Sequence, residues 1–189
     1  MKDAPTRFVA DGFIIRSYRQ GDGEEMARAV RESYDHLRQW MPWATPDQKA
    51  IDSEAYAALC IQNYRAMSDF ALGIWKGNRM VGASGFHLRW GPLDWKVGEI
   101  GMWIAAEEAG SGLGTAALRA MLKWGFTEWD WHRLVWRLDA DNVASERVAQ
   151  KCGLVQEAFL REDRVNCAGV RTSTKIYAIL KSDWEALNS

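Results

Sequence analysis

The first half of the chain begins with a run in which apolar and polar residues alternate, at residues 13–19, and this period-two pattern predicts a half-buried strand. Three further strands are expected at residues 69–76, 80–89 and 95–105, separated by turn signals. Gly77 and Asn78 separate the second strand from the third, and this dipeptide is typical of a hairpin turn. Two helices are expected between the first two strands, at residues 24–33 and 52–67. The pattern therefore indicates antiparallel β structure with two inserted helices.

The second half changes to an alternation of helix and strand. Apolar residues at 118–126 recur at helical spacing, and residues 133–140 predict a strand that can return parallel to 95–105. Asn142 begins another helix, which Gly153 ends as a C-terminal cap. Two last strands are expected at residues 154–164 and 171–180. This half contributes a single βαβ unit and the end of the sheet.

Three local signals add detail. Pro42 interrupts the apolar segment 37–43, which favours an ordered loop over a helix. The helix at 52–67 is expected to bury a face filled by Ala58 and Ile61. Ser182 with Glu185 predicts a capping box for a terminal turn of helix.

Length and charge limit the class of protein. The 189 residues are 48% hydrophobic, which suits one domain, 1–189, with a substantial core. The net charge of −1 gives no basic surface for nucleic acid or an anionic membrane. No apolar run reaches the roughly 18 residues of a spanning helix, and the first residues lack an apolar signal core. We therefore expect a cytoplasmic protein.

Cysteine and histidine spacing predicts neither a disulfide framework nor a metal site. The three cysteines, Cys60, Cys152 and Cys167, show no C-x-x-C spacing, and the histidines are scattered. Each cysteine is expected to be a small buried apolar residue.

A glycine-rich loop lies between the strand at 95–105 and the helix that follows it. Gly110, Gly112 and Gly114 let the backbone approach an anion without interference from Cβ atoms. The N–H groups in the first turn of the helix have no helical acceptor, and the positive end of the helix dipole faces the loop. This arrangement is typical of a phosphate site.

Two familiar kinds of phosphate-binding loop are candidates for this segment. A nucleotide-triphosphate loop needs Gly-Lys-Ser/Thr at its end, whereas Thr115 and Ala116 follow Gly114 here. The dinucleotide pattern G-x-G-x-x-G/A is matched by Gly112, Gly114 and Ala117, so a dinucleotide-binding protein remains an alternative. However, about 95 residues of largely antiparallel β pattern precede the loop, where a dinucleotide fold would begin.

The order of the elements and two motifs resemble the GNAT superfamily of acetyl-CoA-dependent N-acetyltransferases. The motifs are AGSGLG at 109–114 and NVASERVAQKCGL at 142–154, which resemble its pyrophosphate loop and its Asn-x-x-Ser/Ala helix. Three further segments are similar to the RimJ/RimL branch, which acetylates ribosomal-protein N-termini and includes many small-molecule N-acetyltransferases. These segments are HLRQWMPW at 36–43, VGEIGMWI at 97–104 and YAILKSDW at 177–184.

The resemblance covers nearly the whole chain and implies a GNAT-type three-layer α+β fold. Its centre is a mixed, mostly antiparallel sheet of about seven strands flanked by helices, with one βαβ unit around the acetyl-CoA loop. The resemblance also implies the residues that bind acetyl-CoA. They are Met102, Trp103, Ile104, Ala109, Gly110, Ser111, Gly112, Leu113, Gly114, Thr115 and Asn142. Ala109 departs from the Gln or Arg that is usual in the family.

Attack of an amine on a thioester needs a neutral amine, a donor for the oxyanion and a proton for the leaving sulfur. Glu99, on the strand before the loop, is the predicted base, with Glu162 and Asp163 as second choices. The backbone N–H of Met102 or Trp103 is expected to serve the oxyanion. Many members of the superfamily carry a tyrosine at the position of Ala149. The RimJ/RimL branch commonly lacks it, and this makes Ser145 the predicted acid.

Trp40 and Trp43 lie in the loop that covers the acceptor cleft in the resembling family, and they are expected to wall the substrate site. They could equally well pin that loop to the core. The implied partner is an amine acceptor, either a protein N-terminus or a small molecule. Dimers are common among the proteins that the chain resembles, so a homodimer is an open alternative, and the sequence itself does not determine the oligomeric state. A catalytically silent acetyl-CoA-binding module is the main alternative function.

Overall fold

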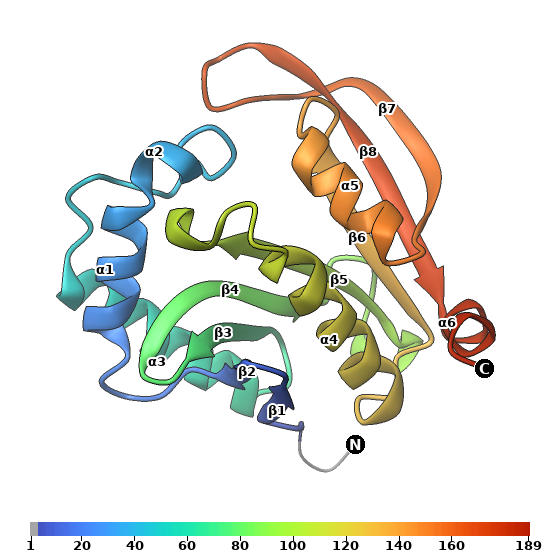
Figure 1. Ribbon diagram of the computed structural model, residues 1–189, viewed down its shortest axis with the longest axis horizontal. Helices are drawn as coiled ribbons and strands as arrows, with labels where there is room; N and C mark the ends of the chain where they lie inside the picture. The colour runs from blue at the N-terminus through green and yellow to red at the C-terminus, as the bar shows by residue number, and fades with distance from the viewer. Residues whose placement is uncertain (1–3) are drawn as a thin grey trace.

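The computed structural model describes residues 4–189, which form three layers (Figure 1). The middle layer is one sheet of eight strands in the order β1-β2-β3-β4-β5-β6-β8-β7. The strands are β1 Arg7–Ala10, β2 Phe13–Ser17, β3 Phe70–Lys76, β4 Arg79–His87, β5 Val97–Ile104, β6 Arg133–Asp139, β7 Val155–Val165 and β8 Arg171–Leu180. The α-helices are α1 Gly23–Glu32, α2 Tyr34–Leu37, α3 Ala50–Arg65, α4 Leu113–Thr127, α5 Val143–Lys151 and α6 Lys181–Leu187.

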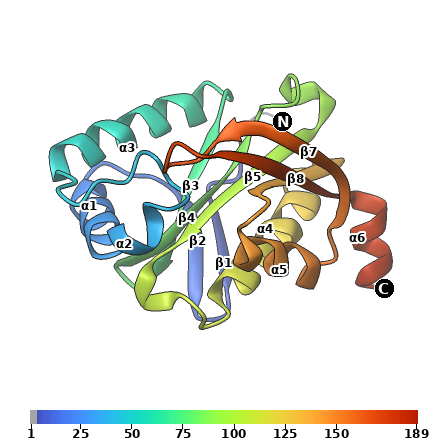
Figure 2. The same cartoon turned by 90° about the horizontal axis from the view of Figure 1, so that it is seen from above.

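The two outer layers are helical. Figure 2 shows α3 on one side of the sheet and α4 on the other. On the first side, Met26 of α1 and Cys60 of α3 pack against Ala71 of β3 and Ala83 of β4. On the second side, α4 buries an apolar face that includes Met121. The sheet is therefore covered on both faces, which explains why β3 and β4 are buried at almost every position.

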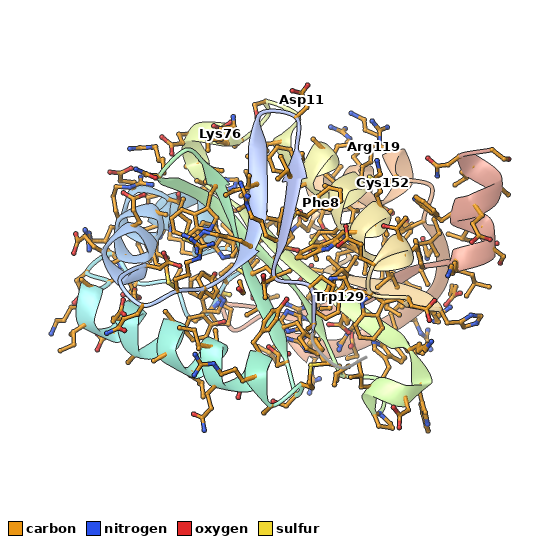
Figure 3. The ribbon with its side chains drawn as sticks, turned by 90° about the horizontal axis from the view of Figure 1, so that it is seen from below. Phe8, Asp11, Lys76, Arg119, Trp129 and Cys152 are labelled. Atoms are coloured by element: carbon orange, nitrogen blue, oxygen red, sulfur yellow. The ribbon has the colours of Figure 1, made fainter. Side chains whose placement is uncertain are left out.

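All neighbouring strands pair antiparallel except β5 and β6, which are parallel and joined by α4. This confirms the predicted mixed sheet with one βαβ unit around the glycine loop. The strand that sequence reasoning missed is β1, which forms a hairpin with β2 around Asp11 and Gly12. It is four residues long, too short to show a clear alternating pattern. Figure 3 shows Phe8 of this strand, whose ring packs 5.8 Å from that of Trp124 in α4.

Three local predictions were wrong. The buried strip of α3 is Ser53, Ala57, Cys60 and Tyr64, whereas Ala58 is exposed. Apolar residues lie all around this helix, so their spacing did not identify the buried side.

The terminal helix α6 begins at Lys181 without the predicted Ser182–Glu185 box, and Asp183 instead accepts a hydrogen bond from the Leu180 N–H. Cys60 and Cys152 are buried as expected, but Cys167 is exposed in the β7–β8 turn.

Aromatic rings fill the core where α4 meets the sheet. Trp129 stacks on Trp131 with the ring centroids 6.1 Å apart, and it meets Phe70 edge to face at 4.7 Å. Trp124 and Phe86 complete the cluster. Such pairs add about 0.5–1.5 kcal/mol each beyond the free energy of burying their area.

Trp129→Ala is expected to lower the free energy of unfolding by about 3–5 kcal/mol, because it leaves a large cavity among rigid rings. Trp95→Ala is the matched control, since the Trp95 side chain is 64% exposed and should cost less than about 0.5 kcal/mol. Urea denaturation of both variants measures the difference. Equal losses would show that this cluster does not organise the core.

Candidate active site

The strands β5 and β6 separate soon after they begin to pair. Parallel pairing joins only residues 97–99 to residues 133–135, and the remainder of each strand has no partner across this gap. The Ala105 N–H donates to Val81 O of β4 at 2.9 Å. Because successive residues direct their N–H groups to opposite edges of a strand, those of Met102 and Ile104 face the gap. The Trp103 N–H faces β4, so of the two N–H groups predicted to serve the oxyanion only that of Met102 faces the gap.

The glycine loop supplies further N–H groups at the mouth of this gap. Gly110 and Gly112 have φ angles of +77° and +92°, and a Cβ atom at either would meet no atom within 4 Å. Gly112 is the N-cap of α4. Among residues 4–189, no protein acceptor pairs with the N–H groups of Gly112, Gly114 or Thr115. An open, glycine-lined surface with unpaired donors at a helix N-terminus fits a phosphate group.

Neighbouring contacts hold the loop in place beside the gap. A Cβ atom on Gly114 would lie 3.6 Å from Val148 of α5 and 3.7 Å from Ile104 of β5, so the loop lies between these two elements. The Ser111 hydroxyl donates to Glu108 O at 2.8 Å and accepts from the Leu113 N–H at 3.3 Å. The loop is therefore ordered by its own serine.

The two carboxylates that precede the loop are compensated by basic side chains. Lys76 donates to Glu108 at 2.6 Å, and Arg79 forms an ion pair with Glu107 at 2.8 Å. The Arg79 guanidinium lowers the pKa of the Glu107 carboxyl. These pairs reduce the repulsion that an incoming anion would otherwise meet.

The start of α5 holds Asn142 and Ser145, the two site residues predicted at this helix. The Asn142 side chain accepts from the Ser145 N–H at 3.0 Å and caps the helix, as expected. The Ser145 hydroxyl accepts a hydrogen bond of 2.9 Å from the indole N–H of Trp136, a buried residue of β6. Because the hydroxyl acts as an acceptor here, its own proton remains available for donation. Ala149 is fully buried and offers no functional group.

Glu99 lies on β5 at the last paired position before the gap. It is only 3% exposed, and its two oxygens accept from Arg89 at 2.8 Å and from the Trp90 indole at 3.0 Å. The structure thus gives Glu99 fixed partners, where an exposed strand face would have left it solvated.

Sequence reasoning missed two neighbours of Glu99. His87 is the direct cross-strand partner of Glu99, and its Nδ1 lies 2.7 Å from an oxygen of Asp69, just before β3. The predicted hairpin turn at Gly77–Asn78 was not a sufficient signal, because a bulge between Ile74 and Trp75 shifts the register by one residue before it brings Asp69 beside His87. The three side chains form a row across the sheet, on the face covered by α1 and α3.

Two of the predicted tryptophans lie outside the core. Trp43 is 47% exposed, and its ring centroid is 6.0 Å from that of Trp103 on β5. Trp40 is half-buried in the same loop. Trp103 belongs to the same sheet face as Glu99, since alternate residues of a strand share a face. The loop therefore places aromatic surface beside the row.

The second-choice bases lie on another strand, at the edge of the sheet. Glu162 and Asp163 lie on β7, which is separated from β5 by β8 and β6 in the sheet. Thr174 donates to Asp163 at 3.0 Å. Within residues 4–189, no cluster of three or more His, Cys, Asp or Glu side chains is arranged to hold a metal ion. No helix in this part of the chain is long and apolar enough to cross a bilayer.

With this geometry in view, the comparisons with known proteins assign the family. Residues 13–155 match the family described as the acetyltransferase (GNAT) domain, and the chain belongs to that family. A Bacillus subtilis protein named as a ribosomal N-acetyltransferase, YdaF, is 27% identical over 183 residues, which are 94% of this chain and 96% of that protein.

Solved structures show the same fold. The ribosomal-protein-S5-alanine acetyltransferase from Vibrio fischeri superposes with a TM-score of 0.84 at 16% identity, covering 95% of this chain and 99% of that one. RimL, a ribosomal alpha-N-protein acetyltransferase in complex with coenzyme A, gives a TM-score of 0.82 at 20% identity, over 92% and 96% of the two chains.

The chain is therefore an acetyltransferase with acetyl-CoA as its acetyl donor. The glycine loop and the free edge of β5 fit such a donor. The dinucleotide alternative does not agree with the fold, because the loop follows the fifth strand of a largely antiparallel sheet. A silent module is not favoured by these comparisons.

Gly112→Val is expected to weaken binding of acetyl-CoA, because it adds bulk and strain where the loop must approach the pyrophosphate. Loss of one charged hydrogen bond costs about 1.5–3 kcal/mol, which is a roughly ten- to hundredfold weaker affinity. Gly12→Val is a matched control with φ of +78° and open surroundings in the β1–β2 turn. Calorimetry compares the two. An unchanged affinity in folded Gly112→Val would refute the assignment of the loop.

Proposed function

We propose that this enzyme acetylates the primary amine of a protein N-terminus. The proposal is supported by the free N–H edge of β5 together with the aromatic surface of Trp43 and Trp103 on the side of the sheet that bears Glu99. Both the similar Bacillus subtilis protein and the fold neighbours are named for action on ribosomal proteins. An N-terminal α-amine is less basic than a lysine side chain, so less free energy is needed to make it neutral.

In this proposal, backbone N–H groups make most of the polar contacts with the acetyl donor. The N–H groups at Gly112, Gly114 and Thr115 hold the pyrophosphate, and Ile104 lines the path between the loop and the gap. The Met102 N–H serves the thioester oxygen, whose negative charge grows as the amine attacks. A fixed donor at that point typically contributes roughly 100- to 1,000-fold to the rate.

Ser145 is proposed to donate a proton to the leaving sulfur. Its hydroxyl is half-buried, and the Trp136 indole fixes the oxygen while leaving the proton free. Asn142 has a positioning role, because its cap fixes the first turn of α5, from which Ser145 projects.

Glu99 is proposed to attract the acceptor's ammonium group rather than to remove its proton. Its oxygens already accept from Arg89 and Trp90, and an amine cannot reach a carboxylate that is 3% exposed without displacing one of them. Trp40 and Trp43 are proposed to hold the apolar part of the acceptor beside Trp103.

An assay of coenzyme A release over a panel of acceptors tests the function. Peptides that begin with Ser, Ala or Met are compared with the same peptides blocked at the N-terminus and with small primary amines. We expect turnover with free N-terminal peptides only. Turnover confined to small amines would assign the enzyme to small-molecule acetylation, and binding of acetyl-CoA without any turnover would support a silent module.

Ser145→Ala is expected to lower kcat by roughly ten- to a hundredfold, at or below the low end of acid–base contributions, because a thiolate is a fairly good leaving group. Affinity for acetyl-CoA should change little, since the Asn142 cap accepts from the Ser145 backbone and survives the substitution. Steady-state kinetics and calorimetry give the two values. A fall in affinity as large as the fall in kcat would mean that the hydroxyl is a binding contact and not an acid.

A further inference from the structure

The imidazole of His87 lies on a surface made by two glycines. Gly85 and Gly101 are cross-strand partners on β4 and β5. A Cβ atom on Gly85 would lie 2.9 Å from His87 Nε2, and one on Gly101 would lie 3.1 Å from it. Any side chain at either position would therefore displace the ring. Because neither glycine has a side chain, the imidazole can lie over Gly101 of β5, the residue before Met102.

Asp69 fixes the orientation of the ring. A carboxylate only accepts hydrogen bonds, so the 2.7 Å contact with Asp69 requires the proton of neutral His87 to be on Nδ1. The other nitrogen, Nε2, then carries a lone pair. It has no hydrogen-bond partner among residues 4–189, and the side chain is 19% exposed. The ring is thus an oriented, accessible base.

We propose that His87, oriented by Asp69, is the general base that removes the proton from the acceptor's ammonium group. This assignment rests on the proposed function, because it needs an amine acceptor beside β5. It replaces the Glu99 carboxylate, whose oxygens are both engaged, with a nitrogen that has a free lone pair. Glu99 is the cross-strand partner of His87 and supplies negative charge next to the proton being transferred.

Every proton and every electron pair is accounted for in the proposed acetyl transfer. The Nε2 lone pair takes one proton from the ammonium group and leaves a neutral amine. The amine nitrogen forms a C–N bond with the thioester carbonyl carbon, the C–S bond breaks, and the sulfur leaves with the electron pair. The sulfur gains a proton from Ser145 or water, and the new amide nitrogen loses its second proton to solvent. His87 finally returns its proton to water.

Two titratable side chains of α3 that lie beside the row stay uncharged near neutral pH. From α3, Tyr56 and Cys60 face Asp69, and burial raises the pKa of both, that of Cys60 to about 11. Arg89 pairs with Glu99 from the β4–β5 connection. Imidazole is the side chain whose charge ordinarily changes between pH 5 and 8. If replacing His87 changes the dependence of the rate on pH, the change can therefore be assigned to its imidazole ring.

The first test is His87→Gln, with His132→Gln as the matched control, because His132 is exposed just before β6 and hydrogen-bonds within the described residues only through its backbone. We expect His87→Gln to lower kcat by roughly 100- to 10,000-fold, the usual range for general-base catalysis. Its residual rate should rise with pH in proportion to the neutral acceptor amine. Affinity for acetyl-CoA should match that of the wild type. A His87→Gln variant whose kcat stays within twofold of the wild type would overturn the proposal. The proposal would also fail if the rate of Glu99→Gln, and not that of His87→Gln, rose with pH in proportion to the neutral acceptor amine.

Two further variants test the orientation of the ring. Gly101→Ala would place its methyl group against His87 alone, so it should lower kcat without weakening coenzyme binding. Asp69→Asn should lower kcat because an amide can hold the wrong tautomer, as an equivalent change does in serine proteases. If both variants keep full activity, His87 has no positioned catalytic role.

Nitrogen NMR of the wild type tests the dyad without turnover. We expect the neutral ring of His87 to be protonated on Nδ1, and this preference to be lost in Asp69→Asn. A ring protonated on Nε2 in the wild type would overturn the proposal. If the wild type acetylates no amine, the proposed function fails, and the NMR result then decides separately whether the oriented base exists.

Discussion

The divergence of β5 from β6 is the constraint on which the site depends. Two parallel strands that stayed paired would satisfy each other's backbone groups and leave nothing to bind a substrate. Here only three residues of each strand pair, so Met102 and Ile104 keep free N–H groups at the centre of the sheet. Both faces of the sheet are packed. The aromatic cluster around Trp129 lies on one face, and the α1–α3 layer lies on the other.

The opening also divides the chemistry between its two faces. On the side of α4 and α5, the glycine loop, the Asn142 cap and Ser145 surround the proposed path of the donor. On the side of α1 and α3, the row from Asp69 to Glu99 lies where an amine would approach. Glycine serves both sides for different reasons. At Gly112 it allows a left-handed backbone, whereas at Gly101 it leaves room for an imidazole ring.

Local sequence patterns predicted the elements whose periodicity matches one-sided burial, along with the glycine loop and the Asn142 cap. They failed where tertiary context decides. In α3, Ser53 is buried while Leu59 is 50% exposed, because apolar residues surround the helix. The Asp69–His87 pair depends on a bulge at Ile74 and Trp75. The register of the turn at Gly77–Asn78, if continued without the bulge, would place Ser68 opposite His87, and no local pattern shows the shift.

An acetyl donor bound in the gap between β5 and β6 would cover the free N–H groups of Met102 and Ile104. Amide hydrogen exchange of β5, measured by NMR with and without acetyl-CoA, detects this binding. We expect acetyl-CoA to slow exchange at Met102 and Ile104, while exchange at Trp103, whose N–H already faces β4, changes little. Equal exchange at Met102 and Ile104 with and without saturating acetyl-CoA would contradict binding in the gap.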